Sequence, residues 1–306
     1  MTPDTCWSLL LALANARRAA TLPNSAFAIR YDTRHDRLDW LPPDVDAPLA
    51  WAPGDGWRIG ASVSADVRDL LDLYLPLIEP RRSVSWVLAQ LGQSIDGYIA
   101  TRDGDAYYVT GPENLTHLHR LRALSDAVIV GANTVAIDNP RLTTRRVPGP
   151  NPVRVVLDAS GRLELGSARL ITDNAARTLI VRQTGLSESA VASAEVLNVA
   201  VTSRGLDLTD LLRQLRALGL GTILVEGGGL TVSRFLEAHL LDRLHIAVAP
   251  LILGSGRPGL TLPPIERLSD ALRPLSRVYR LGRDILWDFD LRAAAPASNP
   301  DASGQT

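Results

Sequence analysis

A short acidic and glycine-rich stretch gives the first indication of chemistry in this sequence. Residues 224–229 read LVEGGG, so one carboxylate and three consecutive glycines follow an apolar run. Glycine weakens regular structure, and three together indicate that the backbone approaches another group closely. A glycine-rich turn between a strand and a helix can present several backbone N–H groups to a phosphate. The stretch matches neither a G-x-G-x-x-G fingerprint nor a Walker loop, so alone it predicts only a nearby anion.

A second polar stretch follows another apolar run. Residues 131–146, GANTVAIDNPRLTTRR, mix glycine, asparagine, threonine, aspartate and proline, and they end in Arg145 and Arg146. Open α/β sheets place their ligands where a strand ends in such a loop. The guanidinium fork matches phosphate oxygens, so these arginines could bind a phosphate. A plain surface loop is the alternative interpretation.

Two further stretches are less specific. In QSIDGYIA (93–100) the Asp-Gly pair predicts a hairpin turn. In the helix predicted next, Thr110 and Glu113 predict a capping box. The arginines of this helix, Arg120 and Arg122, project away from its leucine face. Two arginines on a helix are more often solvated than part of a site, so both interpretations stay open.

The hydrophobic pattern predicts the scaffold that must position these stretches. Apolar runs and helical spacing alternate regularly from residue 84 onward. Strands are predicted over 84–91, 127–131, 153–158, 178–181, 196–199, 222–226, 243–250 and 284–291, and helices over 113–124, 208–218 and 231–239. The last strand alternates apolar and polar residues, which is typical of a half-buried edge strand. The alternation of strands and helices indicates an α/β fold with a mostly parallel sheet covered on both faces.

The two ends of the chain differ from this regular part. Residues 1–82 are rich in proline, aspartate and tryptophan and predict loops that join a few short strands. Within them, residues 66–78 have helical spacing, and Pro76 is expected to bend or end that helix. The tail, residues 293–306, is predicted to be disordered.

Composition excludes several classes of function. The net charge is −1, from 32 basic and 33 acidic residues, so neither a nucleic-acid surface nor a polybasic membrane anchor is expected. The single cysteine, Cys6, excludes an internal disulfide and any cysteine-rich metal site, and no metal is predicted. No apolar stretch approaches the roughly 20 residues that span a bilayer. The default expectation is a soluble cytoplasmic protein.

Taken together and in this order, the four stretches resemble the reductase domain of the riboflavin-biosynthesis deaminase–reductase family. The similarity runs from about residue 84 to 292, and its most specific part is VTGPE followed by HRLRALSDAVIVGANTVAIDNPRLTTR. The segment ILVEGGGLTVSRFLEAHLLDRLHIAVAPLILG is a second hallmark. The resemblance implies a dihydrofolate-reductase-like three-layer α/β fold, a homodimer and NADPH as cofactor. It also implies reduction of the ribosyl group of a 5-amino-6-(5-phosphoribosylamino)uracil to ribityl.

The resemblance also assigns roles to individual residues. It implies that Asp138 and Glu226 are catalytic, and that Glu226 faces the substrate. Arg122, Leu142 and Arg145 would line the substrate pocket, with the two arginines against the substrate phosphate. The residues implied to bind the cofactor are Thr134, Asp138, Ala159, Ser160, Gly227, Gly228, Gly229, Leu230 and Thr231.

The sequence departs from the family pattern at three positions. Tyr108 stands where a tryptophan is frequent, Ala106 stands where a serine is frequent, and the third position, Gln90, changes the charge of the site. Family members commonly have a lysine where this chain has Gln90, so one positive charge is missing from a site for anionic ligands. The zinc deaminase half of the family cannot be built here, because its signature needs more than one cysteine.

The expected organisation is an N-terminal region (1–82), a reductase-like domain (83–292) and a tail (293–306). Three functions remain open: the pyrimidine reductase, a reductase of a different ribosyl or ring compound in flavin-like metabolism, and a catalytically silent nucleotide-binding protein. Gln90 favours the last two, whereas Asp138, Arg145 and Glu226 favour the first. The expected partner is a small phosphorylated pyrimidine.

Overall fold

The computed structural model describes residues 1–80, 84–106, 109–186 and 194–292. The tail that was predicted to be disordered therefore lies outside the described residues. Among the helices described, none is both long and apolar enough to cross a membrane.

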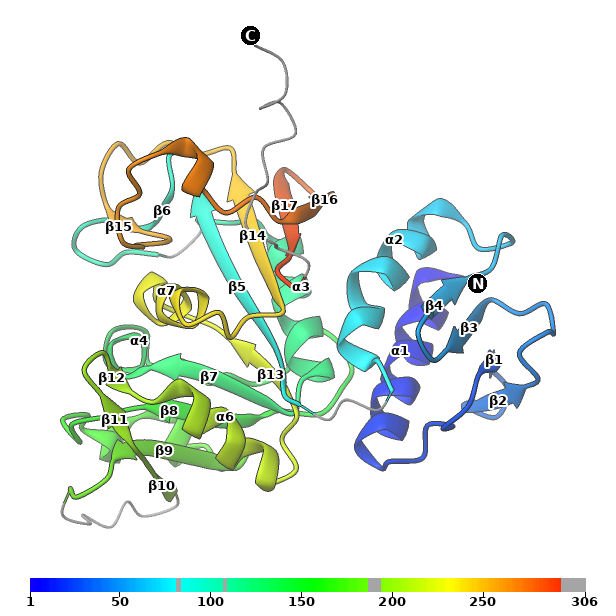
Figure 1. The fold of residues 1–306 in the computed structure, drawn as a ribbon, viewed down its shortest axis with the longest axis horizontal. Helices are drawn as coiled ribbons and strands as arrows, with labels where there is room; N and C mark the ends of the chain where they lie inside the picture. The colour runs from blue at the N-terminus through cyan, green and yellow to red at the C-terminus, as the bar shows by residue number, and fades with distance from the viewer. Residues whose placement is uncertain (81–83, 107–108, 187–193, 293–306) are drawn as a thin grey trace, which may run out of the picture.

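A large sheet forms the centre of the regular part of the chain (Figure 1). Its strands are β5 (Trp86–Ser94), β7 (Ala127–Gly131), β8 (Val153–Leu157), β9 (Thr178–Gln183), β10 (Glu195–Val199), β13 (Thr222–Val225), β14 (Arg243–Ala249), β16 (Leu275–Leu281) and β17 (Asp284–Asp290). Their order is β10-β9-β8-β7-β13-β5-β14-β17-β16. The strands from β10 to β14 run parallel, and β17 and β16 add two antiparallel pairings.

Each predicted strand is confirmed to within a few residues, but the prediction that 284–291 forms an edge strand is wrong. The neighbouring strand β16 pairs with β17 along its whole length and forms the edge instead. The sequence LSRVYRL of β16 has no clear apolar face, and most of its residues are exposed. Its pattern therefore gave no strand signal.

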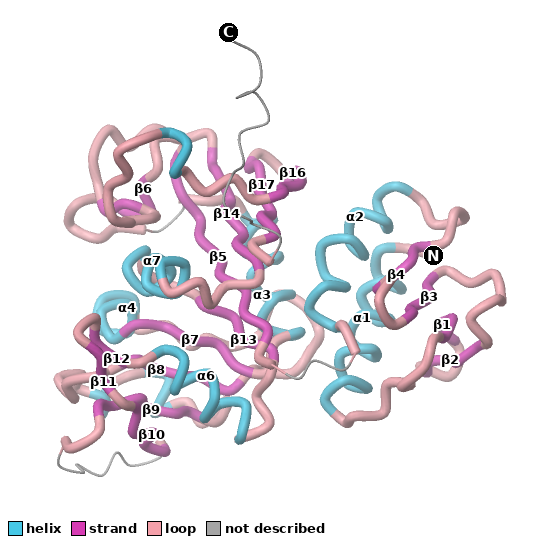
Figure 2. The backbone as a smooth tube through the Cα atoms, in the orientation of Figure 1, coloured by secondary structure: helices cyan, strands magenta, loops and turns pink. Residues whose placement is uncertain are grey.

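Helices cover both faces of the sheet, as Figure 2 shows. On one face, α3 (Pro112–Leu124) and α5 (Arg169–Thr172) pack against alternate strand residues such as Leu88 and Val128. On the other face, α6 (Leu208–Ala217) and α7 (Gly229–Glu237) pack against Ala89 and Ile129. Continuous apolar strands are required because both faces are buried. The predicted three-layer α/β fold with a mostly parallel sheet is confirmed.

Several short elements complete this part of the chain and were not predicted. They are α4 (Ala132–Asp138), β6 (Tyr98–Ala100), β11 (Val201–Thr202), β12 (Gly205–Leu206), β15 (Arg257–Pro258) and the 3-10 turns η2 (Leu165–Ser167) and η3 (Leu268–Asp270). The predicted turn after β5 is confirmed, since the Gly97 N–H donates to the Ser94 carbonyl at 3.0 Å. It does not form a simple hairpin, because β6 pairs with β15.

The N-terminal region is more regular than its sequence indicated. Its elements are α1 (Pro3–Arg18), β1 (Phe27–Asp32), β2 (Arg37–Leu41), β3 (Leu49–Ala52), β4 (Gly56–Ile59), α2 (Ala65–Tyr74) and the 3-10 turn η1 (Leu75–Ile78). The four strands form an antiparallel sheet of order β2-β1-β3-β4. The predicted helix over 66–78 is confirmed, and Pro76 lies in η1, where the α-helix has ended. In Figure 1, α1 lies between this small sheet and α3.

Candidate active site

A cavity of about 870 Å³ lies where β7, β8 and β13 end. These strands are neighbours in the sheet and parallel, so the loops that follow them meet at one edge. The predicted site residues that line the cavity are Arg122, Thr134, Asp138, Leu142, Ala159, Ser160, Glu226, Gly227, Gly228, Gly229, Leu230 and Thr231. A cavity of this size suits a small organic ligand or a cofactor. Arg145 is not among the lining residues.

The three glycines after β13 have three different roles. Gly227 has a φ of +92°, a left-handed conformation that favours glycine. A Cβ on Gly229 would lie 2.3 Å from the carbonyl oxygen of Gly259, so the chain's own packing excludes a side chain there. At Gly228 a Cβ would meet only the Thr134 hydroxyl at 3.4 Å, which is an ordinary contact. Packing within the protein therefore does not by itself require glycine at 228.

The first turn of α7 supplies backbone donors to the cavity. The Gly228 N–H donates to Thr134 Oγ1 at 3.0 Å, which joins this turn to α4. The N–H groups of Gly229 and Leu230 belong to the first helical turn, where helix geometry provides no carbonyl partner. Such donors, together with the helix dipole, favour an anion. This turn therefore fits a phosphate group better than the sequence alone could establish.

Arg122 and Glu226 form a buried ion pair at the cavity wall. Arg122 Nε donates to Glu226 Oε1 at 2.8 Å and Nη2 donates to Oε2 at 2.6 Å, so the contact is bidentate. A third bond runs from Arg122 Nη1 to the Thr143 carbonyl at 3.1 Å. Three of the five N–H groups of Arg122 are thus bonded within the protein, two to Glu226 and one to the Thr143 carbonyl.

Asp138 ends α4 and faces the same cavity. Burial raises the pKa of its carboxyl, and the nearby Arg257 guanidinium partly offsets that rise. The loop that follows is strained, because Asn139 (φ +39°) and Leu142 (φ +54°) are both left-handed without being glycine. Such strain gathers at ligand sites, where the surrounding structure holds the backbone in place.

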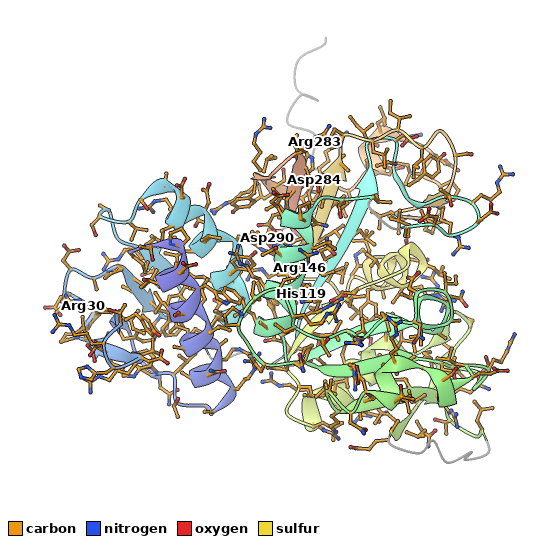
Figure 3. All side chains as sticks on the ribbon, turned by 180° about the vertical axis from the view of Figure 1, so that it is seen from behind. Arg30, His119, Arg146, Arg283, Asp284 and Asp290 are labelled. Atoms are coloured by element: carbon orange, nitrogen blue, oxygen red, sulfur yellow. The ribbon has the colours of Figure 1, made fainter. Side chains whose placement is uncertain are left out.

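Arg145 lies beside the cavity wall rather than in it. Its Nη1 donates to Thr143 Oγ1 at 2.7 Å, and its backbone N–H donates to His119 Nδ1 at 2.8 Å. Burial first, and then the nearby arginines, lower the pKa of His119 to about 4. Figure 3 shows His119 near Arg146, in a cluster of positive charge. The role of Arg145 against a substrate phosphate stays a prediction.

Gln90 occupies its position as a neutral, hydrogen-bonded residue. It is 5% exposed, and its Nε2 donates to Asn114 Oδ1 at 3.2 Å. The Asn114 amide in turn donates to Thr110 Oγ1 at 2.9 Å.

The predicted capping box at the start of α3 is wrong. The N-cap of α3 is Gly111, and the Thr110 hydroxyl accepts from the Asn114 side chain instead of from the backbone N–H of Glu113.

Three arginines that sequence reasoning missed also line the cavity: Arg162, Arg234 and Arg257. Arg162 follows the predicted residue Ser160 by two positions, and Arg234 lies one helical turn after Leu230. For these two arginines, closeness to predicted positions was the only signal available, and Arg257 had no such signal. With Arg122 they make four arginines in the cavity lining, against the three carboxylates of Asp138, Asp158 and Glu226, so positive charge exceeds negative charge by one, which suits anionic ligands.

Comparison with known proteins decides the family. The family model described as the RibD C-terminal domain matches residues 85–286. The chain belongs to the RibD C-terminal domain family. A relative from Methanothermobacter thermautotrophicus, named 2,5-diamino-6-ribosylamino-4(3H)-pyrimidinone 5′-phosphate reductase, is 35% identical over 215 residues, which cover 68% of this chain and 98% of the relative.

Two further RibD proteins extend the comparison. The riboflavin biosynthesis protein RibD of Aquifex aeolicus is 31% identical over 226 residues, which cover 73% of this chain and 62% of that protein. The crystal structure of the Thermotoga maritima diaminohydroxyphosphoribosylaminopyrimidine deaminase/5-amino-6-(5-phosphoribosylamino)uracil reductase matches with a TM-score of 0.59 and 26% identity, over 76% of this chain and 63% of that one. The chain thus spans less than two thirds of these two RibD proteins, and the resemblance to the RibD reductase domain is confirmed.

Proposed function

We propose that this chain is an NADPH-dependent reductase that converts the ribosyl group of a phosphoribosylaminopyrimidine to ribityl in riboflavin biosynthesis. The observation that carries the proposal is the meeting of an anion-binding helix turn and a buried Arg122–Glu226 pair in one cavity. The reductase names of the relatives support the same activity. A reduction of this kind requires a nicotinamide cofactor and a phosphorylated sugar in one enclosed space.

The residues of the chain position the reactants. When bound, the nicotinamide would supply a hydride to the sugar C1′ of the substrate, while the C1′–O4′ ring bond breaks and O4′ takes a proton to become a ribityl hydroxyl. The first turn of α7 binds a cofactor phosphate, and Thr134 holds that turn by accepting the Gly228 N–H. Arg122 fixes the Glu226 carboxylate in one orientation toward the substrate. Most of the rate in such a reaction comes from holding the two carbons together in a dry, oriented geometry.

The preference for NADPH over NADH rests on the cationic part of the cavity. NADPH carries an additional phosphate, and Arg162 and Arg234 line the wall near the Ala159–Ser160 turn and α7. Guanidinium groups bind phosphate oxygens with charge-assisted hydrogen bonds. Replacing both arginines with glutamine should therefore weaken NADPH binding while leaving NADH binding nearly unchanged, as measured by fluorescence titration.

The activity is tested by following the loss of NADPH absorbance with two substrates. These are 5-amino-6-(5-phosphoribosylamino)uracil and 2,5-diamino-6-ribosylamino-4(3H)-pyrimidinone 5′-phosphate, and ribityl product is identified by mass spectrometry. Turnover of either substrate supports the proposal and identifies the base that this chain accepts. Absence of turnover with both, in protein that binds NADPH, would contradict it.

A reductase of a different ribosyl or ring substrate is the second candidate, and Gln90 favours it. Gln90 is buried and bonded to Asn114, so this wall of the cavity offers an amide where a cation would attract an anionic substrate. A panel of ribosylated heterocycles with and without phosphate separates the two candidates. The second candidate requires a compound that is turned over faster than both pyrimidine phosphates.

We further propose a homodimer that covers the α7-side face of β14, β17 and β16. On β17 two acidic side chains are buried and two large apolar ones are exposed, the reverse of the usual burial on a strand. Asp284 and Asp288 are buried, while Ile285 and Trp287 are 38% and 39% exposed. Trp287 pairs in register with Val278, which is also exposed. Light scattering should give twice the chain mass at micromolar concentration, and Trp287→Asp should give the monomer. A monomeric wild-type protein would contradict the homodimer.

The organisation and location of the chain remain proposals as well. We propose that residues 83–292 act as the reductase domain and residues 1–82 as a distinct N-terminal region, because the family model begins at residue 85. We propose a cytoplasmic location, since the relatives are named as enzymes of biosynthesis.

A further inference from the structure

Helix α3 has one side in the cavity and another against the N-terminal region. Asn114, Leu115, Leu118 and Arg122 line the cavity. The opposite side packs into a single hydrophobic core that contains residues of α1 and α2 as well as Leu121 and Leu124 of α3. The position of the substrate-facing residues therefore depends on contacts made by a region that lies outside the family match.

Two arginines of α1 hold the C-terminal end of α3. Arg18 Nη2 donates to the carbonyls of Ala123 and Ser125 at 2.7 and 3.0 Å, and Arg17 Nη2 donates to the Leu124 carbonyl at 3.3 Å. The last carbonyls of a helix have no intrahelical partner, and cations there also complement the helix dipole. Arg17 and Arg18 thus cap α3 from another helix, directly after Arg122.

The same arginines reach the strand that leads to Glu226. Arg17 and Arg18 both contact the carboxylate of Asp126, with the Arg17 Nη2 to Oδ1 distance at 2.7 Å. The other oxygen of Asp126 accepts the N–H groups of Gly221 and Thr222, where β13 begins. One carboxylate therefore joins α1, the end of α3 and the start of β13.

A buried polar chain holds the middle of α3. The Tyr74 hydroxyl of α2 lies 2.8 Å from His117 Nδ1, and His117 Nε2 lies 3.1 Å from His245 Nδ1. His245 Nε2 lies 3.2 Å from Asp288 Oδ1. All four side chains are at least 98% buried. The Tyr74–His117 and His117–His245 hydrogen bonds compensate for polar groups removed from water, whereas His245 Nε2 and Asp288 Oδ1 lie close together without hydrogen-bond geometry. In addition, the Arg120 guanidinium stands over the rings of Trp7 and Tyr74.

We propose that the N-terminal region braces α3, and that Arg17, Arg18 and Tyr74 are positioning residues for the substrate side of the cavity. The predicted cofactor residues lie on the loops after β7, β8 and β13, whereas α3 supplies substrate-side residues such as Arg122. Loosening α3 should therefore weaken substrate binding more than cofactor binding. This part of the inference rests on the proposed reductase function.

The test compares Tyr74→Phe and the double variant Arg17→Gln/Arg18→Gln with two matched controls in the full chain. Tyr31→Phe removes a hydroxyl that bonds Asp36 and Ser8 within the N-terminal region and does not reach α3. Arg213→Gln removes an exposed arginine that pairs with Asp210 on α6. Hydrogen exchange over residues 112–126 is measured by mass spectrometry, together with the substrate KM and the NADPH Kd.

The brace predicts faster exchange in 112–126 for both test variants and unchanged exchange for both controls. For Tyr74→Phe, which leaves the Asp126 contacts to β13 intact, it also predicts a substrate KM raised on the order of tenfold, with the NADPH Kd within about twofold of wild type. If both test variants exchange residues 112–126 at the wild-type rate, the proposal that the N-terminal region holds α3 in place is overturned, whether or not the protein turns over substrate. Faster exchange in Tyr74→Phe with equal losses for substrate and NADPH would overturn the positioning role. Absence of wild-type turnover would instead contradict the reductase function, and the exchange measurement would still decide the brace.

Discussion

Arg122 and Glu226, which are 104 residues apart in the chain, meet in a bidentate contact of 2.8 and 2.6 Å at the cavity wall. Their side chains are only 8% and 5% exposed. The charge of each side chain is therefore compensated by the other. The Thr143 carbonyl accepts a further hydrogen bond from Arg122 Nη1. A buried ion pair of this kind contributes more to the orientation of its members than to stability.

Removing one member of this pair should destabilise the fold more than removing both. Arg122→Met or Glu226→Leu leaves one buried charge without a partner, which typically costs about 3–5 kcal/mol. The double variant replaces both charges with apolar groups and should recover at least half of that loss. Urea unfolding of the four proteins gives the coupling free energy. Additive single losses would show that the pair is not coupled.

Alanine at two adjacent glycines should separate a binding effect from a folding effect. Gly228→Ala places its Cβ in ordinary contact with Thr134, so the melting temperature should stay within a few degrees of wild type. If a cofactor phosphate approaches the backbone there, the NADPH Kd should rise by at least about tenfold, since a charge-assisted bond contributes roughly 1.5–3 kcal/mol. Isothermal titration measures that Kd, and an unchanged value would remove Gly228 from the phosphate site.

Gly229→Ala is the contrasting variant. Its Cβ would lie 2.3 Å from the Gly259 carbonyl oxygen and 2.5 Å from that of Pro258. Backbone must move to relieve these contacts, so the variant should lose stability whether or not NADPH is present. A Gly229→Ala protein as stable as wild type in thermal unfolding would show that the 258–259 segment adjusts freely.

The sequence predicted the central sheet well because both of its faces are buried. Strands such as β7 (AVIVG) and β13 (TILV) are continuously apolar, and their ends point to the loops that line the cavity. Helix α1 was missed, although Leu9, Leu10 and Leu13 are almost fully buried. The proline, aspartate and tryptophan content of residues 1–82 indicated loops and short strands and gave no sign of this helix.

The site itself was only partly predictable. Residue types and spacing indicated Glu226 and the glycines, and the resemblance supplied Arg122. No local sequence pattern predicts that two side chains 104 residues apart form an ion pair. The same holds for Tyr74 and His117, which meet only because α2 packs on α3. Long-range side-chain partners depend on how elements pack, and a single sequence does not contain that information in local form.

Acid should destabilise the protein through His119. Its pKa falls from the usual 6.5 to about 4 in the fold, so the folded state binds fewer protons than the unfolded state between these values. The contribution of the neutral His119 ring to the free energy of unfolding is fully present above about pH 6.5 and is lost as the pH falls toward 4. His119→Asn retains an acceptor for the Arg145 N–H but cannot titrate, so its stability should fall less steeply.

Urea unfolding at about pH 7, 5.5 and 4.5 checks this difference in slope. His117, whose pKa burial lowers well below its usual value, is present in both proteins and contributes equally. Parallel curves for wild type and His119→Asn would show that His119 does not control the acid sensitivity.

Arg145 provides the sharpest test of where the substrate phosphate lies. In the structure its guanidinium bonds the Thr143 hydroxyl at 2.7 Å and stands outside the cavity lining, in a cluster of positive charge with Arg141 and Arg146. If it turns to grip the phosphate, Arg145→Ala should lose a charge-assisted contact of roughly 1.5–3 kcal/mol. The expected loss in kcat/KM is about tenfold to a hundredfold, with NADPH binding unchanged. Arg145→Lys should recover only part of it, because a point charge cannot reproduce the guanidinium fork.

The matched control for Arg145 is its neighbour. Arg146→Ala removes the same charge from the adjacent exposed position, so a general electrostatic effect would lower kcat/KM in both variants alike. Each variant is assayed with the phosphorylated substrate and with its dephosphorylated analogue. A specific phosphate contact requires that Arg145→Ala lose activity on the phosphorylated substrate and little on the analogue, while Arg146→Ala stays near wild type on both. Equal losses on the two substrates would place the phosphate elsewhere and make the cavity-lining arginine Arg257 the next residue to replace.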